Sequence, residues 1–230
     1  MNEKDYLTFS FLFEFPERKV QYNILLDKTT VRQKFVDSWE KPKWTELDFE
    51  KCTVCPLSSN SVSHCPLALS TVRPITDFKA SISYERVKLT VTSPERTYFK
   101  ESDLQTALSS FMGFLMATSG CPHFEKLRPM ARFHLPFSTM EETIFRVVSS
   151  YLLGEIILHR QNPDLSLKGI VEMYEKIGQV NRQFMQRLYT ATTMDSSLNA
   201  VVILDGFASV LPFVIESNLE EIKYLWGKYS

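Results

Sequence analysis

The chain begins with two segments in which apolar and polar residues alternate at every second position. A period of two is typical of a β-strand with one buried face, because successive side chains in a strand point to opposite faces. The residues between the segments, Pro16-Glu17-Arg18, favour a turn. We therefore predict a β-hairpin whose apolar face is covered by a helix or a second sheet layer. Its apolar positions are Leu7, Phe9, Phe11, Phe13 and Phe15 in the first strand and Val20, Tyr22, Ile24 and Leu26 in the second.

Two more strands and one long loop are predicted in the first hundred residues. Residues 87–91 alternate again, and a Ser93-Pro94-Glu95 turn leads into a strand at about residues 96–100. Residues 40–66 contain prolines, serines and three cysteines, and we predict an irregular loop there. Loops of more than about 12–15 residues without secondary structure are uncommon in compact domains and are often functional.

Helical spacing of apolar residues dominates after Lys100. Two capping boxes, Ser102 with Gln105 and Ser138 with Glu141, mark predicted helix starts. Since no flexible linker separates the halves, we predict a single α+β domain over residues 1–230, with a mainly antiparallel sheet in 1–100 packed against a helical half of about four helices in 101–230. The predicted helices cover about residues 30–39, 67–79, 104–116, 138–160, 166–190 and 195–229, the last with a kink or break near Pro212.

The composition is that of an ordinary globular protein, with 44% hydrophobic and 23% charged residues in a chain of 230. The formal net charge is −1, so no strong basic field attracts nucleic acid or an anionic membrane. We expect neither of these as a partner. A protein partner or a homo-oligomer is the remaining expectation.

No segment has the pattern of a signal peptide, because the first five residues are polar and no continuous apolar run follows them. The most apolar stretch, from Leu198 to Ile215, is explained better by a buried helix of a soluble protein than by a membrane span. It is interrupted by Asn199, Asp205, Ser209 and Pro212. We therefore expect a cytoplasmic protein whose thiols stay reduced.

The few glycines argue against conventional nucleotide binding. There are seven, and none lies before Gly113. Phosphate-binding loops need glycines that let backbone amides approach the ligand, and neither GxGxxG nor GxxxxGK[ST] occurs.

The four cysteines are the strongest candidates for chemistry. Cys52 and Cys55 form a CxxC pair, Cys65 follows after nine intervening residues, and Cys121 lies far along the chain. Two thiolates at the CxxC spacing can bind one metal ion through a tight turn. Three of the four cysteines are followed by proline, which stiffens the chain just past each sulfur. We predict that all four converge on one metal ion.

The sequence leaves the metal open. Closed Cys₄ sites are typical of structural zinc, which we favour, and four thiolates also hold a [4Fe–4S] cluster. Buried thiols without a metal, or a dithiol pair, are the remaining interpretations. His64 and His123 each neighbour a cysteine, but four cysteines already complete a tetrahedral site, so we expect neither as a ligand.

A second candidate site follows Cys121. Arg128, Arg132 and His134 lie among apolar residues in the segment 127–137. Two arginines could bind a phosphate or carboxylate, and a histidine could transfer protons. The alternative is a connecting segment whose charges form structural ion pairs, which is the more common role of such residues. No HExxH, GxSxG or Glu-x-x-His motif occurs, so we assign no catalytic residue.

Four motifs together resemble those of an uncharacterised bacterial domain family. They are CTVCPL (52–57), CPLA (65–68), SGCP (119–122) and LRPMARFHLPF (127–137), and the resemblance covers most of the chain. It implies a bacterial cytoplasmic protein of unknown function and no particular activity.

These observations predict a soluble metal-binding protein with a regulatory or interaction role, and we lean away from an enzyme. An iron–sulfur redox or sensor protein is the main alternative. An enzyme or a sensor of an anionic ligand, using Arg128, Arg132 and His134, is a further one.

Overall fold

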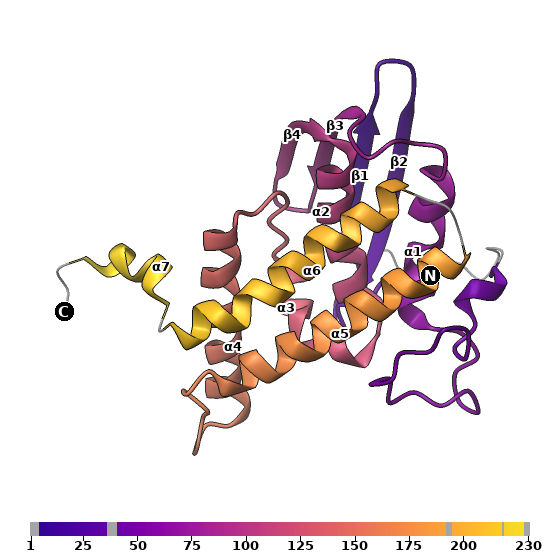
Figure 1. The fold of residues 1–230 in the computed structure, drawn as a ribbon. Helices are drawn as coiled ribbons and strands as arrows, with labels where there is room; N and C mark the ends of the chain where they lie inside the picture. Colours follow the sequence, from indigo (N-terminus) through magenta and orange to yellow (C-terminus); the bar gives the residue numbers. More distant parts are fainter. Residues whose placement is uncertain (1–4, 36–40, 192–194, 218, 228–230) are drawn as a thin grey trace.

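The computed structural model describes residues 5–35, 41–191, 195–217 and 219–227. A four-stranded sheet from the first half of the chain precedes a helical half, so the predicted α+β class is confirmed (Figure 1). The elements are β1 (Tyr6–Glu14), β2 (Lys19–Asp27), η2 (Lys43–Thr45), α1 (Pro66–Asp77), β3 (Arg86–Thr92), β4 (Thr97–Asp103), α2 (Leu104–Thr118), η3 (Pro122–Leu127), α3 (Arg128–Arg132), α4 (Met140–Leu158), α5 (Lys168–Ala191), α6 (Asp195–Glu216), α7 (Glu220–Lys223) and η4 (Tyr224–Trp226).

The sheet has the strand order β2-β1-β3-β4, and all neighbouring strands are antiparallel. The predicted hairpin is present as β1 and β2, with Phe11 opposite Tyr22. Phe9, Phe11 and Phe13 are fully buried, while the residues between them are only partly buried. The alternation in the sequence therefore describes one core face and one outer face of the sheet.

Helix α2 covers the core face of the sheet. The ring of Phe111 lies 4.5 Å from that of Phe11, and the ring of Phe114 lies 4.9 Å from that of Phe9. In Figure 1, α6 crosses in front of α2, and α5 runs alongside α6. The apolar outer side of α2 is thus buried by a second layer of helices, which explains why α2 is apolar almost all round.

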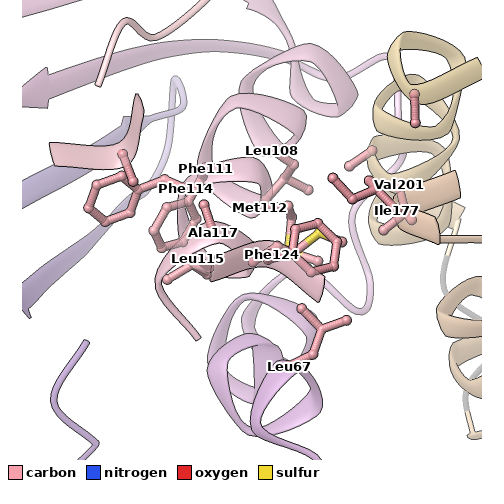
Figure 2. Close-up of a cluster of buried hydrophobic side chains, with 14 of the residues drawn as sticks. Leu67, Leu108, Phe111, Met112, Phe114, Leu115, Ala117, Phe124, Ile177 and Val201 are labelled. Carbon is pink, nitrogen blue, oxygen red and sulfur yellow. The ribbon is translucent and has the colours of Figure 1, made fainter. Parts of the chain in front are cut away.

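One cluster of buried side chains joins these layers. Figure 2 shows Leu67 of α1, Phe124 of η3, and Ile177 and Val201 of the two long helices gathered around α2, which contributes Met112 among others. Helix α1, which follows the predicted cysteine loop, and η3, which follows Cys121, therefore pack against the same core as the sheet.

The N-terminal caps of two helices lie one residue later than predicted. Asp103 caps α2 by accepting a hydrogen bond from the amide of Thr106 at 2.8 Å. The capping box of α4 is formed by Thr139 and Glu142. Ser102 does not cap α2, because it still pairs with Val87 in the sheet. Strand β4 therefore continues to Asp103, and the helix begins after that residue.

The predicted helix at residues 30–39 is wrong in its described part. The Asp27 carboxylate accepts hydrogen bonds from the amides of Thr29 and Thr30, which closes a turn in place of a helix. Gln33 then continues in extended form and pairs with Leu26. Residues 36–40 lie outside the described residues.

The last predicted helix is interrupted at a different place from the one expected. Pro212 lies inside α6, which continues to Glu216. Leu219 has a φ of 59°, and α7 begins directly after it. The break therefore falls several residues beyond the proline, where the chain adopts a left-handed conformation.

Within the described residues, one helix is long and apolar enough to cross a membrane: Ser197–Glu216, with a mean hydropathy of 2.0. Core helices of soluble proteins meet the same criteria. The face of α6 that includes Ala208 and Leu211 is buried in the helical layer, while Val202, Val210 and Phe213 are exposed. The helix is therefore buried along one face, which is less complete burial than its composition suggested.

Candidate functional site

The loop between β2 and α1 is held by a buried arginine of α5. The side chain of Arg187 is 1% exposed. Its guanidinium donates hydrogen bonds to the carbonyl oxygens of Trp44 at 2.7 Å, Glu46 at 2.8 Å, Leu47 at 3.2 Å and Glu50 at 3.3 Å. The part of this loop from residue 44 to residue 50 is thus fixed to a helix far along the chain.

The CxxC turn is held by the same face of α5. Gln183 lies four residues before Arg187, so the two side chains are neighbours on the helix surface. Its side-chain oxygen accepts a hydrogen bond from the amide of Thr53, and its side-chain nitrogen donates one to the hydroxyl of Thr53, both at 2.8 Å. Within the turn, the amide of Cys55 donates to the carbonyl of Cys52 at 2.9 Å.

Cys65 and Cys121 occupy equivalent positions at two helix starts. Cys65 is the residue before α1 and Cys121 is the residue before η3. The prolines that follow them are the first residues of these helices, a position that suits proline because its missing amide hydrogen has no partner there. The sequence pattern identified the prolines as stiffening residues, and the structure shows that they begin helices.

Backbone amides at these helix starts face the two sulfurs. The amides of Ala68 and Leu67 favour the charged form of Cys65, and the amide of His123 does the same for Cys121. Such amides are suited to stabilising thiolates, since the N-terminus of a helix carries partial positive charge. Gly120, with a φ of 89°, turns the chain after α2 so that Cys121 can begin the next helix.

A direct contact places the CxxC turn beside Cys121. The Nε2 atom of His123 lies 2.7 Å from the carbonyl oxygen of Val54, which is between Cys52 and Cys55 in the sequence. Cys65 is held to the start of the same loop, because its amide donates to the carbonyl of Thr45 at 2.8 Å. The structure therefore brings together three chain segments that contain all four cysteines.

Neighbouring sulfurs lie close enough to affect the ionisation of Cys52, Cys65 and Cys121. Burial raises the pKa of Cys52 to about 11 and that of Cys121 to about 12, and it also raises the pKa of Cys65. The neighbouring sulfurs of Cys65, Cys52 and Cys55 further raise the pKa of Cys121. The guanidinium of Arg187 acts in the opposite direction on Cys52 and Cys65.

The thiols do not form a finished coordination sphere. All four cysteines are free. In the described part of the chain, no group of three or more His, Cys, Asp or Glu side chains is arranged to hold a metal ion. What the structure provides is a set of four neighbouring sulfur donors, the donor type that suits zinc and iron–sulfur clusters.

The two histidines beside the cysteines have other contacts. The Nδ1 atom of His64 lies 2.9 Å from the hydroxyl of Thr45, and His123 contacts the CxxC turn through Nε2. Each imidazole therefore connects parts of the loop region.

Arg128, Arg132 and His134 are not brought together. Arg128 donates to the carbonyl of Thr30 at 2.6 Å and lies 3.7 Å from a carboxylate oxygen of Glu125. Arg132 forms an ion pair with Glu95 at 3.0 Å. Both arginines thus make structural contacts, while His134 faces a cavity.

The cavity has a volume of about 370 Å³ and lies among α2, the α3–α4 segment, α5 and α6. His134, Arg146, Tyr174 and Asn181 are polar residues in its wall. Two buried atoms there, Nε2 of His134 and Oδ1 of Asn181, have no hydrogen-bond partner among the described residues. Sequence reasoning missed the last three residues. Arg146 could have been noticed in the sequence, because it directly precedes Val147 and Val148, which are buried in α4.

Burial keeps His134 neutral. Loss of solvent lowers the pKa of its imidazole to about 3, and the charge of Arg146 contributes in the same direction. The whole side chain is only partly buried, but its Nε2 atom is shielded from solvent. Two phenylalanine rings, Phe114 at 5.1 Å and Phe11 at 5.9 Å, pack against the imidazole.

Acid should destabilise the protein through His134. In the unfolded chain the imidazole binds a proton near its ordinary pKa of 6.5, whereas the folded chain resists protonation until about pH 3. Stability is therefore lost as the pH falls below about 6.5, with an expected loss of about 2 kcal/mol between about pH 7.5 and pH 5. Urea unfolding at the two pH values measures this loss.

The matched variant for this measurement is His134→Gln, which is polar and neutral at both pH values. Other groups, including the thiols, titrate equally in the two proteins. We expect the variant to lose about 2 kcal/mol less than the wild type over the same pH range. Equal losses in both proteins would show that His134 is already accessible to protons in the folded state.

Comparisons with known proteins give one family match. The family described as a domain of unknown function, DUF6901, matches residues 7–227. No curated protein and no solved structure matches the chain. The family match covers both the sheet and the helices, together with all four cysteines. The chain therefore belongs to the DUF6901 family, an uncharacterised family as its motifs indicated.

Proposed function

We propose that this protein binds one metal ion through Cys52, Cys55, Cys65 and Cys121, and that zinc in a structural role is the metal. The observation that supports the proposal is that three separate chain segments, which contain all four cysteines, contact one another near Cys121. Four sulfur donors match the closed Cys₄ sites of structural zinc. Convergence on one ion would require the side chains to rearrange, since the sulfurs are not already arranged as ligands.

The charge around the cysteines supports an anionic centre. Arg187 is buried, and among the described residues no carboxylate forms an ion pair with it. A buried charge is costly unless it is compensated. Four thiolates around a divalent ion carry a net charge of −2, so the guanidinium would offset part of that charge, as its effect on Cys52 and Cys65 indicates.

The proposed role of the metal is to fix the long loop against the helical half. Metal binding there would contribute directly to the free energy of folding. A non-catalytic regulatory or interaction role in the cytoplasm, with a protein partner or a second copy of the chain, remains our prediction from the sequence.

Elemental analysis and an absorption spectrum of anaerobically purified protein test the proposal. We expect a colourless protein with about one zinc ion per chain. A brown protein with charge-transfer absorption and bound iron would instead support the iron–sulfur redox or sensor alternative. Four titratable thiols without any metal after purification and reconstitution would contradict both.

A further inference from the structure

The cavity beside His134 has the size of a small-molecule site. Its volume of about 370 Å³ falls within the range of roughly 300–1,000 Å³ that is usual for ligand pockets. At about 30 Å³ for each water molecule, it would hold about a dozen waters or a ligand of about that many non-hydrogen atoms. No cysteine lines it, so it is separate from the proposed metal centre.

Three polar groups of the wall lie near one another, and one of them lacks a partner. The charge of Arg146 acts on both His134 and Tyr174, which places these three side chains together. The imidazole Nε2 of His134 has no hydrogen-bond partner among the described residues. Tyr174 is 5% exposed, and it lines the same cavity. Buried polar groups are rarely left unsatisfied, so each such group requires an explanation.

Arg146 is a half-buried cation in the cavity wall, and no ion pair is formed with it by any described carboxylate. Its Nη2 atom donates to the carbonyl oxygens of Met130 at 2.8 Å and Phe133 at 3.3 Å. Burial lowers its pKa. The nearby Glu142 uses its carboxylate in the capping box of α4. A desolvated guanidinium in this setting favours an anion.

The charges and shape of the wall narrow the class of ligand. Lys100 and Arg146 line the cavity, and no Asp or Glu does so among the described residues. Most of the remaining wall is apolar, with Phe114, Ile177 and Phe207 among its residues. A ligand with a long apolar body and a single negative charge fits this wall, whereas a polyphosphate or a sugar would leave many polar groups unpaired.

We infer that the cavity binds a compact monocarboxylic acid with an apolar body, such as a medium-chain fatty acid. Its carboxylate accepts hydrogen bonds from Arg146, from Nε2 of His134 and from the hydroxyl of Tyr174. The apolar body lies between α2 and α6. Asn181 lies two helical turns from Tyr174, about 10 Å along α5, so it gives the cavity a separate hydrogen-bonding point beyond reach of the carboxylate.

Isothermal titration with decanoate, kept below its micelle concentration, tests the inference on the full chain. Decanoate has about a dozen non-hydrogen atoms, as the cavity volume requires. We expect saturable binding of one decanoate per chain and at least about tenfold weaker binding of 1-decanol and decylamine, which lack the negative charge. Equal binding of decanol, or no saturable binding of decanoate, would overturn the inference.

Two variants identify the site. Arg146→Met should weaken decanoate binding by about ten- to a hundredfold, since it removes a charge-assisted hydrogen bond. Arg182→Met removes an exposed arginine of α5 outside the cavity and should leave binding unchanged. If Arg146→Met does not fold, Ala208→Phe keeps the test decisive, because it fills the cavity from α6 without removing a polar contact. Undiminished binding in Ala208→Phe would place decanoate elsewhere.

Discussion

Cys121→Ser should lower the metal content and the thermal stability together. Cys121 is the one proposed ligand outside the loop, so it alone connects the metal to the end of α2 and the start of η3. A serine hydroxyl is a poor replacement for a soft thiolate ligand. We expect most of the zinc to be lost, with a destabilisation of at least about 3 kcal/mol, which corresponds to about 6–12 °C in melting temperature for a chain of this size.

The matched control is Ser119→Ala, two residues earlier. Ser119 is also buried, and its hydroxyl accepts a hydrogen bond from the amide of Cys121 at 3.1 Å. Its loss should cost about 1 kcal/mol and leave the metal content unchanged. Elemental analysis and thermal unfolding, each with and without a chelator, separate the two effects. A Cys121→Ser protein with unchanged zinc would exclude Cys121 as a ligand.

The sheet could be predicted from the sequence because its pattern has one physical cause. Phe9, Phe11 and Phe13 alternate strictly, and a half-buried strand is the structure that buries all three on one face. Their partners on α2 could not be assigned in advance. Phe111 and Phe114 lie on a helix that is apolar on several sides, so its periodicity does not indicate which side meets the sheet.

Helix boundaries were less predictable because several residues compete for the same role. Ser138 and Thr139 are both good caps and each is followed three residues later by a glutamate, so the sequence permits either start. At the turn after β2, the Asp27 side chain replaces helical hydrogen bonds with local ones. This effect depends on where the strand ends, which the periodicity does not fix to the residue.

That the four cysteines share one metal ion remains a prediction from their number and spacing, whereas the residues that hold the loop could not be predicted. Arg187 is three residues after Phe184 and seven after Val180, which places it on the buried face of α5. That placement was a detectable signal, since a charge on an apolar helix face needs a partner. Its partners are backbone carbonyls, and no sequence pattern identifies those.

The second candidate site, too, could be predicted only in part from the sequence. The segment 127–137 indicated a polar group among apolar residues, and His134 does face a cavity. The cation beside it comes from α4, since Arg146 and His134 are brought together by the packing of that helix on the segment. Arg128 and Arg132 find nearby carboxylates, which is the usual fate of arginines at the surface.

Arg187→Met should destabilise the protein more than any other single change in α5. The methionine would fill much of the space, but four carbonyl oxygens of the loop would lose their donor. Removing one partner from a buried charged network costs about 3–5 kcal/mol, which corresponds to about 6–20 °C in melting temperature here. Thermal unfolding of the metal-free protein measures this structural effect by itself.

Two further variants separate packing from charge. Arg182→Met removes an arginine of the same helix that forms an exposed ion pair with Asp205, so it should cost at most about 1 kcal/mol. Arg187→Lys keeps the charge but loses the fork of donors, and it should destabilise the metal-free protein nearly as much as Arg187→Met.

If the guanidinium also compensates the thiolates, Arg187→Met should weaken zinc binding in a chelator competition by at least about tenfold, and Arg187→Lys should recover most of that loss. A methionine variant as stable as Arg182→Met would show that the loop is held by other contacts, and equal zinc affinity in all variants would remove the charge argument for an anionic centre.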